Sequence, residues 1–247
     1  MSNVTILIFA MGIYATYLTL SAVGALRHPT WLSTIVRLPY TILHESSHAL
    51  AGLFTLKGIR TIRILPSTIT TKHGNDINTV GAYIPKRKSP FGIGFFNLGE
   101  VMTSFAGPFL PPMLAHSLVS YVKFNRLESL YAFALVLLVF LVLFSRERFL
   151  LLIITGIAYY YYKQSPNPEL FVSNATLIIV AWVLFGMIEE FFVLGSYNDK
   201  GSDMGNITYH LIGQDRKWLN KILNFFIRAY YIIAMIGIIQ TLQVNFN

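Results

Sequence analysis

The chain of 247 residues contains no cysteine and carries little charge. The absence of cysteine excludes disulfide bonds, thiolate metal sites and cysteine nucleophiles. Charged residues make up 12% of the chain, about half of their share in soluble domains, whereas hydrophobic residues make up 54%. This composition excludes a disordered protein, a nucleic-acid module with a solvated surface and an ordinary cytosolic enzyme. It is typical of an integral membrane protein.

Charged side chains are also absent from the first 26 residues, which contain no histidine either. A secretory signal peptide is one interpretation, because residues 21–25 are mostly small, as at a cleavage site. However, no Lys or Arg precedes the apolar run, and the run exceeds the usual length of about 7–15 residues. We therefore expect a retained helix.

Further apolar runs follow, and a membrane-spanning helix needs about 20 mostly apolar residues. We predict an all-α polytopic protein with six or seven transmembrane helices, forming a single membrane domain over residues 1–247. The candidate spans are 4–26, 34–56, 98–122, 127–144, 146–163, 170–194 and 219–242. With seven spans, the N-terminus is cytoplasmic. If the short segment 146–163 does not cross the membrane, this assignment of sides no longer holds.

Most of the positive charge lies in one loop, residues 57–97. Between Lys57 and Lys88 there are seven basic residues and one acidic residue, a net +6 of the chain's +8. The positive-inside rule predicts that this loop is cytoplasmic, and attraction to anionic lipid is a second use of its charge. Nucleic acid is not an expected partner, because the chain shows no recognised module for it. Two β-like runs, 60–65 and 79–84, predict a small β-hairpin-like insertion here.

The second candidate span carries His44-Glu45-Ser46-Ser47-His48, which fits the pattern H-E-x-x-H. On a helix, side chains four residues apart lie one above the other, so both imidazoles can bind one zinc ion. Glu45 lies beside this face and can act as a general base. A chain of this composition contains about 0.004 such matches by chance.

The alternative interpretation of this motif is three polar residues that face a pocket without a metal. An ionisable group at mid-membrane costs about 2.5–3.5 kcal/mol on insertion scales, so three of them within five residues need a strong common partner. A divalent metal ion is the simplest such partner. The small residues that follow, Ala49, Ala51 and Gly52, would let other helices approach the site closely.

Residues 43–52, within a predicted membrane helix, resemble the site-2 protease family of intramembrane zinc metalloproteases. In the next span, Ser104-Phe105-Ala106-Gly107-Pro108 is similar to the small-residue Gly-Pro element of that family. The resemblance covers about residues 36–115. The Asn-Pro-Asp-Gly or Leu-Asp-Gly element, from which most of the family supplies its third metal ligand, does not occur here.

The third ligand therefore has to come from another segment. Asp203 is favoured because it lies between small residues at a predicted helix start and resembles the Ser-Asp element of a divergent branch of the family. N-capping of that helix is an alternative role for Asp203. The other candidates for the third ligand are Asp199, Glu189, Glu190 and His210.

Two further features carry chemistry but have common structural explanations. Glu189 and Glu190 are expected to form an interfacial pair that faces water near the cytoplasmic end of their span. His116, in the third span, could contact the substrate or an oxyanion, although a lone histidine within a membrane is more often a hydrogen-bonded packing residue.

The resemblance implies a zinc metalloendopeptidase that cleaves a membrane-protein or peptide substrate within the lipid bilayer. In that function Glu45 is the catalytic base, and His44, His48 and Asp203 hold the zinc. The β-like runs would offer an edge on which a locally unwound substrate extends. The alternative from another class is a non-proteolytic membrane scaffold or assembly subunit that keeps the protease-like fold. A transporter is less favoured, because no paired discontinuous helices appear in related halves.

Overall fold

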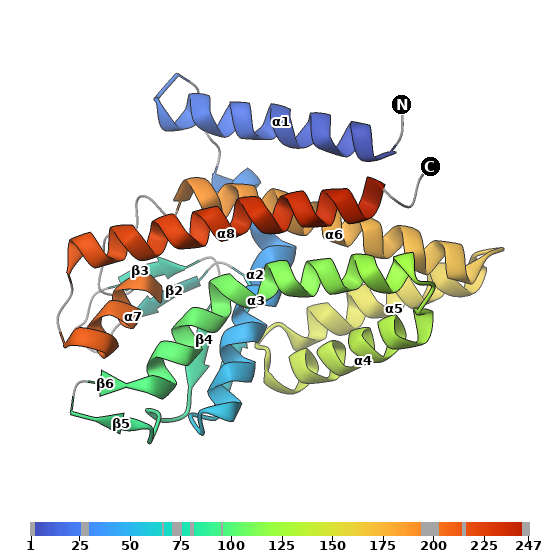
Figure 1. The fold of residues 1–247 in the computed structure, drawn as a ribbon. Coiled ribbons are helices and arrows are strands. Elements are labelled where there is room, and N and C mark those ends of the chain that lie inside the picture. Colours follow the sequence, from blue (N-terminus) through green and yellow to red (C-terminus); the bar gives the residue numbers. More distant parts are fainter. Residues whose placement is uncertain are drawn as a thin grey trace.

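Helices make up most of the chain, and short strands lie between the second and the third helix (Figure 1). The computed structural model describes residues 3–25, 30–65, 67–70, 76–79, 82–94, 96–193, 203–213 and 216–243. The helices are α1 (Asn3–Ala22), α2 (Thr30–Phe54), α3 (Leu98–Lys123), α4 (Leu127–Phe144), α5 (Arg148–Gln164), α6 (Pro168–Val193), α7 (Asp203–Ile212) and α8 (Lys217–Gln243). The strands are β1 (Ile59–Arg63), β2 (Ser67–Thr70), β3 (Asp76–Thr79), β4 (Ala82–Pro85), β5 (Gly92–Ile93) and β6 (Phe96–Asn97).

Four of these helices are long and apolar enough to cross a membrane, judged by length and composition. They are α1, α4, α6 and α8. α5 has only 17 residues, and α2 and α3 are long enough but are not among the helices that are sufficiently apolar. The predicted number of six or seven spans is therefore not confirmed and stays a prediction, as does the sidedness of the loops.

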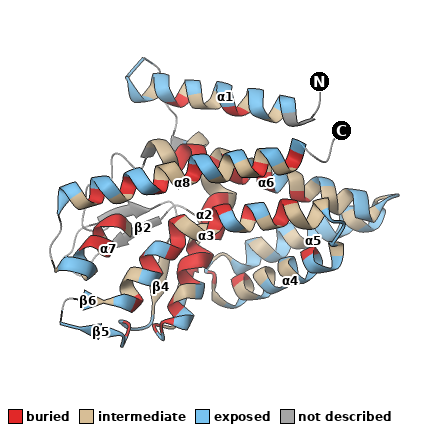
Figure 2. Ribbon diagram, viewed as in Figure 1, coloured by how far each residue is buried: buried red, intermediate tan, exposed pale blue. Residues whose placement is uncertain are grey.

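The outer helices expose their apolar side chains, whereas buried residues gather on the inner helices (Figure 2). α4 buries only Leu130 and Leu141, and α5 buries no residue at all. Apolar helix surfaces of this extent are suited to contact with lipid. The interior lies where α2 crosses α3 and α6, and there the side chains of Tyr40, Leu184 and Met187 are almost completely buried.

The strands form three separate two-stranded antiparallel sheets, β1–β4, β2–β3 and β5–β6. β1 and β4 overlap the β-like runs expected at 60–65 and 79–84, and they pair with Ile62 opposite Tyr83. The prediction of a single hairpin is therefore incomplete. β1 and β4 pair with each other, and β2 and β3, which lie between them in the sequence, form a separate antiparallel pair. Ile59, Ile62 and Ile64 pack with Ala49 of α2, so the β1–β4 sheet is held against the helix of the H-E-x-x-H motif.

Gly52 has a different neighbour from the one expected. A Cβ atom at this position would collide with the hydroxyl group of Tyr83. The missing side chain therefore lets strand β4, and not another helix, pack closely against α2. The Tyr83 hydroxyl donates to the Gly58 carbonyl at 2.8 Å. Burial, followed by the nearby Glu100 carboxylate, raises the pKa of Tyr83 to about 12, so the hydroxyl stays protonated.

α3 runs without interruption through Pro108, Pro111 and Pro112, although proline in a helix interior removes a backbone hydrogen bond. All three prolines are buried, so neighbouring helices enclose the weakened stretch. The helix begins at an N-cap, where the Asn97 side chain accepts from the Glu100 N–H at 3.0 Å.

Candidate metal centre

Three side chains from two helices meet in the interior. His44 and His48 lie one turn apart on α2, and their Nε2 atoms are 3.0 Å from each other. Asp203, the first residue of α7, places Oδ2 at 3.2 Å from His44 Nε2 and at 3.3 Å from His48 Nε2. Each residue offers one ligand atom to a common point, so the group can hold a metal ion.

The donor set fits zinc. Zinc prefers four ligands in a tetrahedron with N and O distances of about 2.0–2.1 Å, which corresponds to separations of about 3.3 Å between ligand atoms. The three separations of 3.0–3.3 Å lie close to that value. Two imidazoles and one carboxylate are also the protein ligand set of several catalytic zinc sites, which keep a fourth position for water or substrate.

The electrostatics of Asp203 favour a bound cation. Burial alone would raise the pKa of the carboxyl group, but the neighbouring His48 and His44 outweigh this effect and lower the pKa of Asp203 well below its usual range. The carboxylate is therefore ionised at neutral pH and available as a ligand.

The other nitrogen of each imidazole is held by the protein. His48 Nδ1 lies 2.6 Å from the Thr103 carbonyl oxygen on α3, so it is the donor and Nε2 keeps its lone pair. His44 Nδ1 lies 3.4 Å from the Tyr40 hydroxyl, which in turn is hydrogen-bonded to Tyr231 of α8. Such outer contacts fix the tautomer and the ring orientation of a metal-binding histidine. Neither partner was among the residues predicted from the sequence: Thr103 reaches His48 only through the packing of α3 on α2, whereas Tyr40 lies one helical turn before His44, and this local spacing could have indicated it.

Gly107 of the Ala-Gly-Pro element packs directly against the two imidazoles. A Cβ atom at this position would lie 2.7 Å from His44 Nε2 and closer still to the His48 ring. α3 can therefore approach the site only because residue 107 has no side chain.

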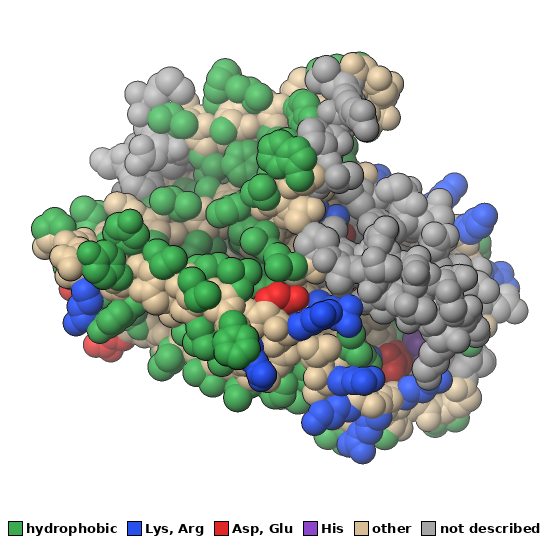
Figure 3. Space-filling model, turned by 180° about the vertical axis from the view of Figure 1, so that it is seen from behind, with side chains coloured by type: hydrophobic (Ala, Val, Ile, Leu, Met, Phe, Trp, Pro, Cys, Tyr) green, Lys and Arg blue, Asp and Glu red, His purple; other side chains and the backbone are tan. Residues whose placement is uncertain are grey.

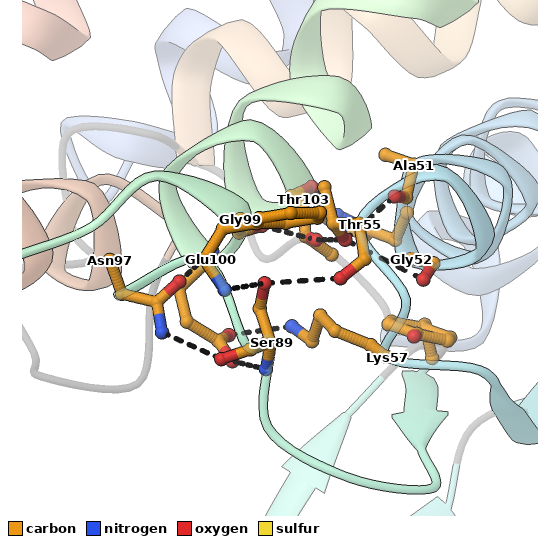
Figure 4. Close-up of polar contacts among 12 residues, drawn as sticks. Ala51, Gly52, Thr55, Lys57, Ser89, Asn97, Gly99, Glu100 and Thr103 are labelled. Atoms are coloured by element: carbon orange, nitrogen blue, oxygen red, sulfur yellow. Dashed lines mark hydrogen bonds and ion pairs between the residues drawn. The ribbon is translucent and has the colours of Figure 1, made fainter. Parts of the chain in front are cut away.

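A network of polar contacts braces α2 against α3 next to this site (Figure 4). Lys57 Nζ lies 2.5 Å from Glu100 Oε2, and both side chains are largely buried. Ser89 joins the two helices, since its N–H donates to Glu100 at 3.2 Å and its hydroxyl donates to the Thr55 carbonyl at 3.0 Å. Thr55 reaches the Thr103 hydroxyl at 3.3 Å, so the brace ends at the residue whose carbonyl holds His48.

We expect Lys57→Met to destabilise the folded protein by about 3–5 kcal/mol, because it leaves the Glu100 carboxylate buried without its cation. Thermal unfolding of the purified protein in detergent measures this effect. The double variant Lys57→Met with Glu100→Gln removes both charges and keeps an acceptor for the Ser89 N–H, so it should recover most of the loss. Equal destabilisation by the single and the double variant would contradict a role for the ion pair.

Glu45 is buried beside the three ligand candidates. Its carboxylate interacts electrostatically with His44, His48 and Asp203, and it accepts a hydrogen bond from the backbone N–H of Tyr83. Strand β4 therefore passes directly beside the residue that the motif assigns as a base.

The remaining predicted candidates lie elsewhere in the structure. Glu190 is paired with Arg37 of α2, and Glu189 accepts from the hydroxyls of Tyr14 and Ser33, each at 2.6 Å. Both glutamates are buried, so the expected pair facing water is wrong: their polar partners come from α1 and α2, far away in the sequence.

Two histidines and one aspartate complete the set of candidates. His210 belongs to the last turn of α7, whereas Asp203 begins that helix. His116 is exposed and lies 3.4 Å from the Thr241 hydroxyl of α8, about 13 Å along α3 from Gly107. Its role as a substrate or oxyanion contact stays a prediction. Asp199 lies outside the described residues.

The fold and the site together define a helical membrane protein with a buried His-His-carboxylate group on its H-E-x-x-H helix. A family model described as Peptidase M50B-like matches residues 13–236, so the chain belongs to this family. This confirms the predicted membership in the site-2 protease family. Neither the curated proteins nor the solved structures contain a match to the chain. The family and the four apolar helices support an integral membrane protein of the protease class.

Proposed function

We propose that this protein is a zinc-dependent intramembrane endopeptidase. The observation that carries the proposal is the meeting of His44 Nε2, His48 Nε2 and Asp203 Oδ2 within 3.0–3.3 Å of one another, beside the buried Glu45. The family membership supports the protease class. The apolar helices support a substrate that is itself embedded in the membrane.

The chemistry follows from the residues around this centre. When bound, zinc lowers the pKa of a water molecule towards about 7 and stabilises negative charge on a carbonyl oxygen. Glu45 takes the proton from the attacking water on its carboxylate and passes it to the leaving amide nitrogen. The Tyr83 N–H holds that carboxylate, while Thr103 and Tyr40 hold the imidazoles in place.

The substrate has to be unwound locally, and β4 offers an edge for the extended segment. One edge of β1 is occupied by β4, and the other meets the α4–α5 connection, where Ile62 bridges Ser145 and its carbonyl accepts from the Arg146 N–H at 2.9 Å. The backbone N–H of Tyr83 on β4 interacts with the Glu45 carboxylate, so β4 passes beside Glu45. A peptide that adds to this edge of β4 would pass the catalytic carboxylate with its scissile bond.

The test is Glu45→Gln in the purified chain, reconstituted with a panel of single-span membrane proteins as substrates. We expect cleavage to fall by about 10²–10⁴-fold, because a general base contributes that much, while the zinc content stays at the level of the unaltered protein. Zinc is measured by elemental analysis. Loss of zinc in this variant would make Glu45 a ligand or a folding residue instead. A zinc-loaded, unaltered protein that cleaves no member of the panel would favour the scaffold function.

A further inference from the structure

One end of the molecule combines positive charge with exposed apolar side chains. Figure 3 shows Lys and Arg side chains gathered at one end of the molecule, next to a surface of hydrophobic side chains. We call the exposed residues Arg60, Lys86, Arg87 and Lys88 the basic collar. Beside the collar, the end of α2 and the β5–β6 hairpin expose Phe54 (75%), Ile93 (86%) and Phe91 (49%). This combination is typical of a surface at the level of the lipid headgroups, where apolar side chains reach inward and cations remain in the polar layer.

The collar borders a pocket of about 390 Å³ between the end of α2 and the end of β4. Leu53 and Leu56 form an apolar wall, and Lys86 and Arg87 supply cationic groups. Lys57 and Gly58 complete the lining. A pocket with an apolar wall and a cationic rim suits a molecule that joins a hydrocarbon chain to a phosphate.

The charges in this pocket differ in their availability. Lys57 is held by Glu100 at 2.5 Å, so its charge is already balanced. Arg87 donates from Nε to the Leu56 carbonyl at 2.8 Å, which fixes the guanidinium at the pocket and leaves its terminal amino groups able to bind an anion. Lys86 and Arg87 are therefore the groups that can hold a phosphate.

We propose that this pocket binds an anionic phospholipid, with the phosphate on Lys86 and Arg87 and an acyl chain along Leu53 and Leu56. The β5–β6 hairpin enters the same leaflet with Ile93 at its exposed tip. His48 lies six residues before Phe54 on α2, which is about 9 Å along the helix. The bound lipid thereby sets the depth of the metal centre below the headgroups. This binding is independent of the proposed peptidase activity and is measured without a substrate.

Native mass spectrometry of the full chain in detergent tests the pocket, with dioleoyl phosphatidylglycerol and dioleoyl phosphatidylcholine as probes. We expect the anionic lipid to bind in preference to the zwitterionic lipid with the same chains. The double variant Lys86→Gln with Arg87→Gln should lower the affinity for the anionic lipid about 25-fold, since each cation at an anionic lipid surface raises the affinity about five-fold. The matched control, Lys123→Gln with Arg126→Gln, removes two charges at the far end of α3 and just beyond it, and should leave the affinity unchanged.

Two results would overturn the proposal. If both double variants lower the affinity for the anionic lipid equally, the binding reflects the net charge of the protein and not this pocket. If inorganic phosphate at millimolar concentration displaces the lipid, the site binds free phosphate and the acyl chain has no part in it. Thermal unfolding of each variant shows whether the fold is retained.

The absence of cysteine permits an independent measurement of the hairpin. Ile93→Cys gives a single thiol for a bimane label, and spin-labelled lipids then report its depth in a bilayer. We expect strong quenching at residue 93 and weak quenching at an exposed control, Gln164→Cys, at the C-terminal end of α5 next to a polar turn. Equal quenching at the two positions would show that the hairpin lies in water, and the proposed orientation would then be wrong.

Discussion

Asp203→Ala should lower the zinc affinity by more than about 100-fold and reduce cleavage to background. Removal of an outer partner of a metal ligand typically costs about 10–100-fold, so loss of a ligand itself should cost more. The Asp203 carboxylate contributes a negative charge at 3.2 Å and 3.3 Å from the two imidazole nitrogens. Chelator competition with the purified chain measures the affinity, and Asp203→Asn separates the loss of charge from the loss of the oxygen ligand.

Glu190→Gln is the matched control for this experiment. Its carboxylate is paired with Arg37 and not with the imidazoles, so the variant should keep its zinc while losing stability. If Asp203→Ala retains its full zinc affinity, the third ligand lies elsewhere. Asp199→Ala and Glu190→Ala would then have to be compared for loss of zinc.

The histidines of the centre could be predicted from the sequence because their geometry is local. A spacing of four residues on a helix brings His44 and His48 together whatever the rest of the chain does. Asp203 lies 155 residues beyond His48 in the sequence, and only its setting among small residues at a helix start favoured it. Its place beside the imidazoles depends on how α7 packs against α3, which no local pattern encodes.

The same difference explains where the sequence misled. Glu189 and Glu190 were expected to face water, because charge in a span is costly without a partner. Their partners, Arg37, Ser33 and Tyr14, come from α1 and α2, and these contacts bury the pair. Similarly, the small Gly52 indicated a close contact but could not show that the contact is Tyr83 of a strand. The apolar runs thus indicated where the long helices lie, whereas the arrangement of the strands and the long-range polar partners required the structure.

Gly107→Ala should weaken zinc binding by about 100-fold, although it replaces none of the proposed ligand residues. The added methyl group would stand 2.7 Å from His44 Nε2 and nearer still to His48, at the two atoms that would hold the metal. α3 cannot readily move away, because the Lys57–Glu100 pair and the Ser89 contacts brace it against α2. The imidazoles must therefore rotate, and His48 must stretch its 2.6 Å contact with the Thr103 carbonyl.

The control for this variant is Gly237→Ala on α8, where an added Cβ meets no atom within 4 Å. That substitution should leave zinc binding unchanged and raise stability by about 0.4–1 kcal/mol, as is usual for glycine in an unstrained helix. If Gly107→Ala binds zinc as tightly as Gly237→Ala, then α3 is free to yield and the Gly-Pro element does not define the centre. If the affinity falls while the far-ultraviolet circular dichroism is kept, residue 107 shapes the metal site through its lack of a side chain.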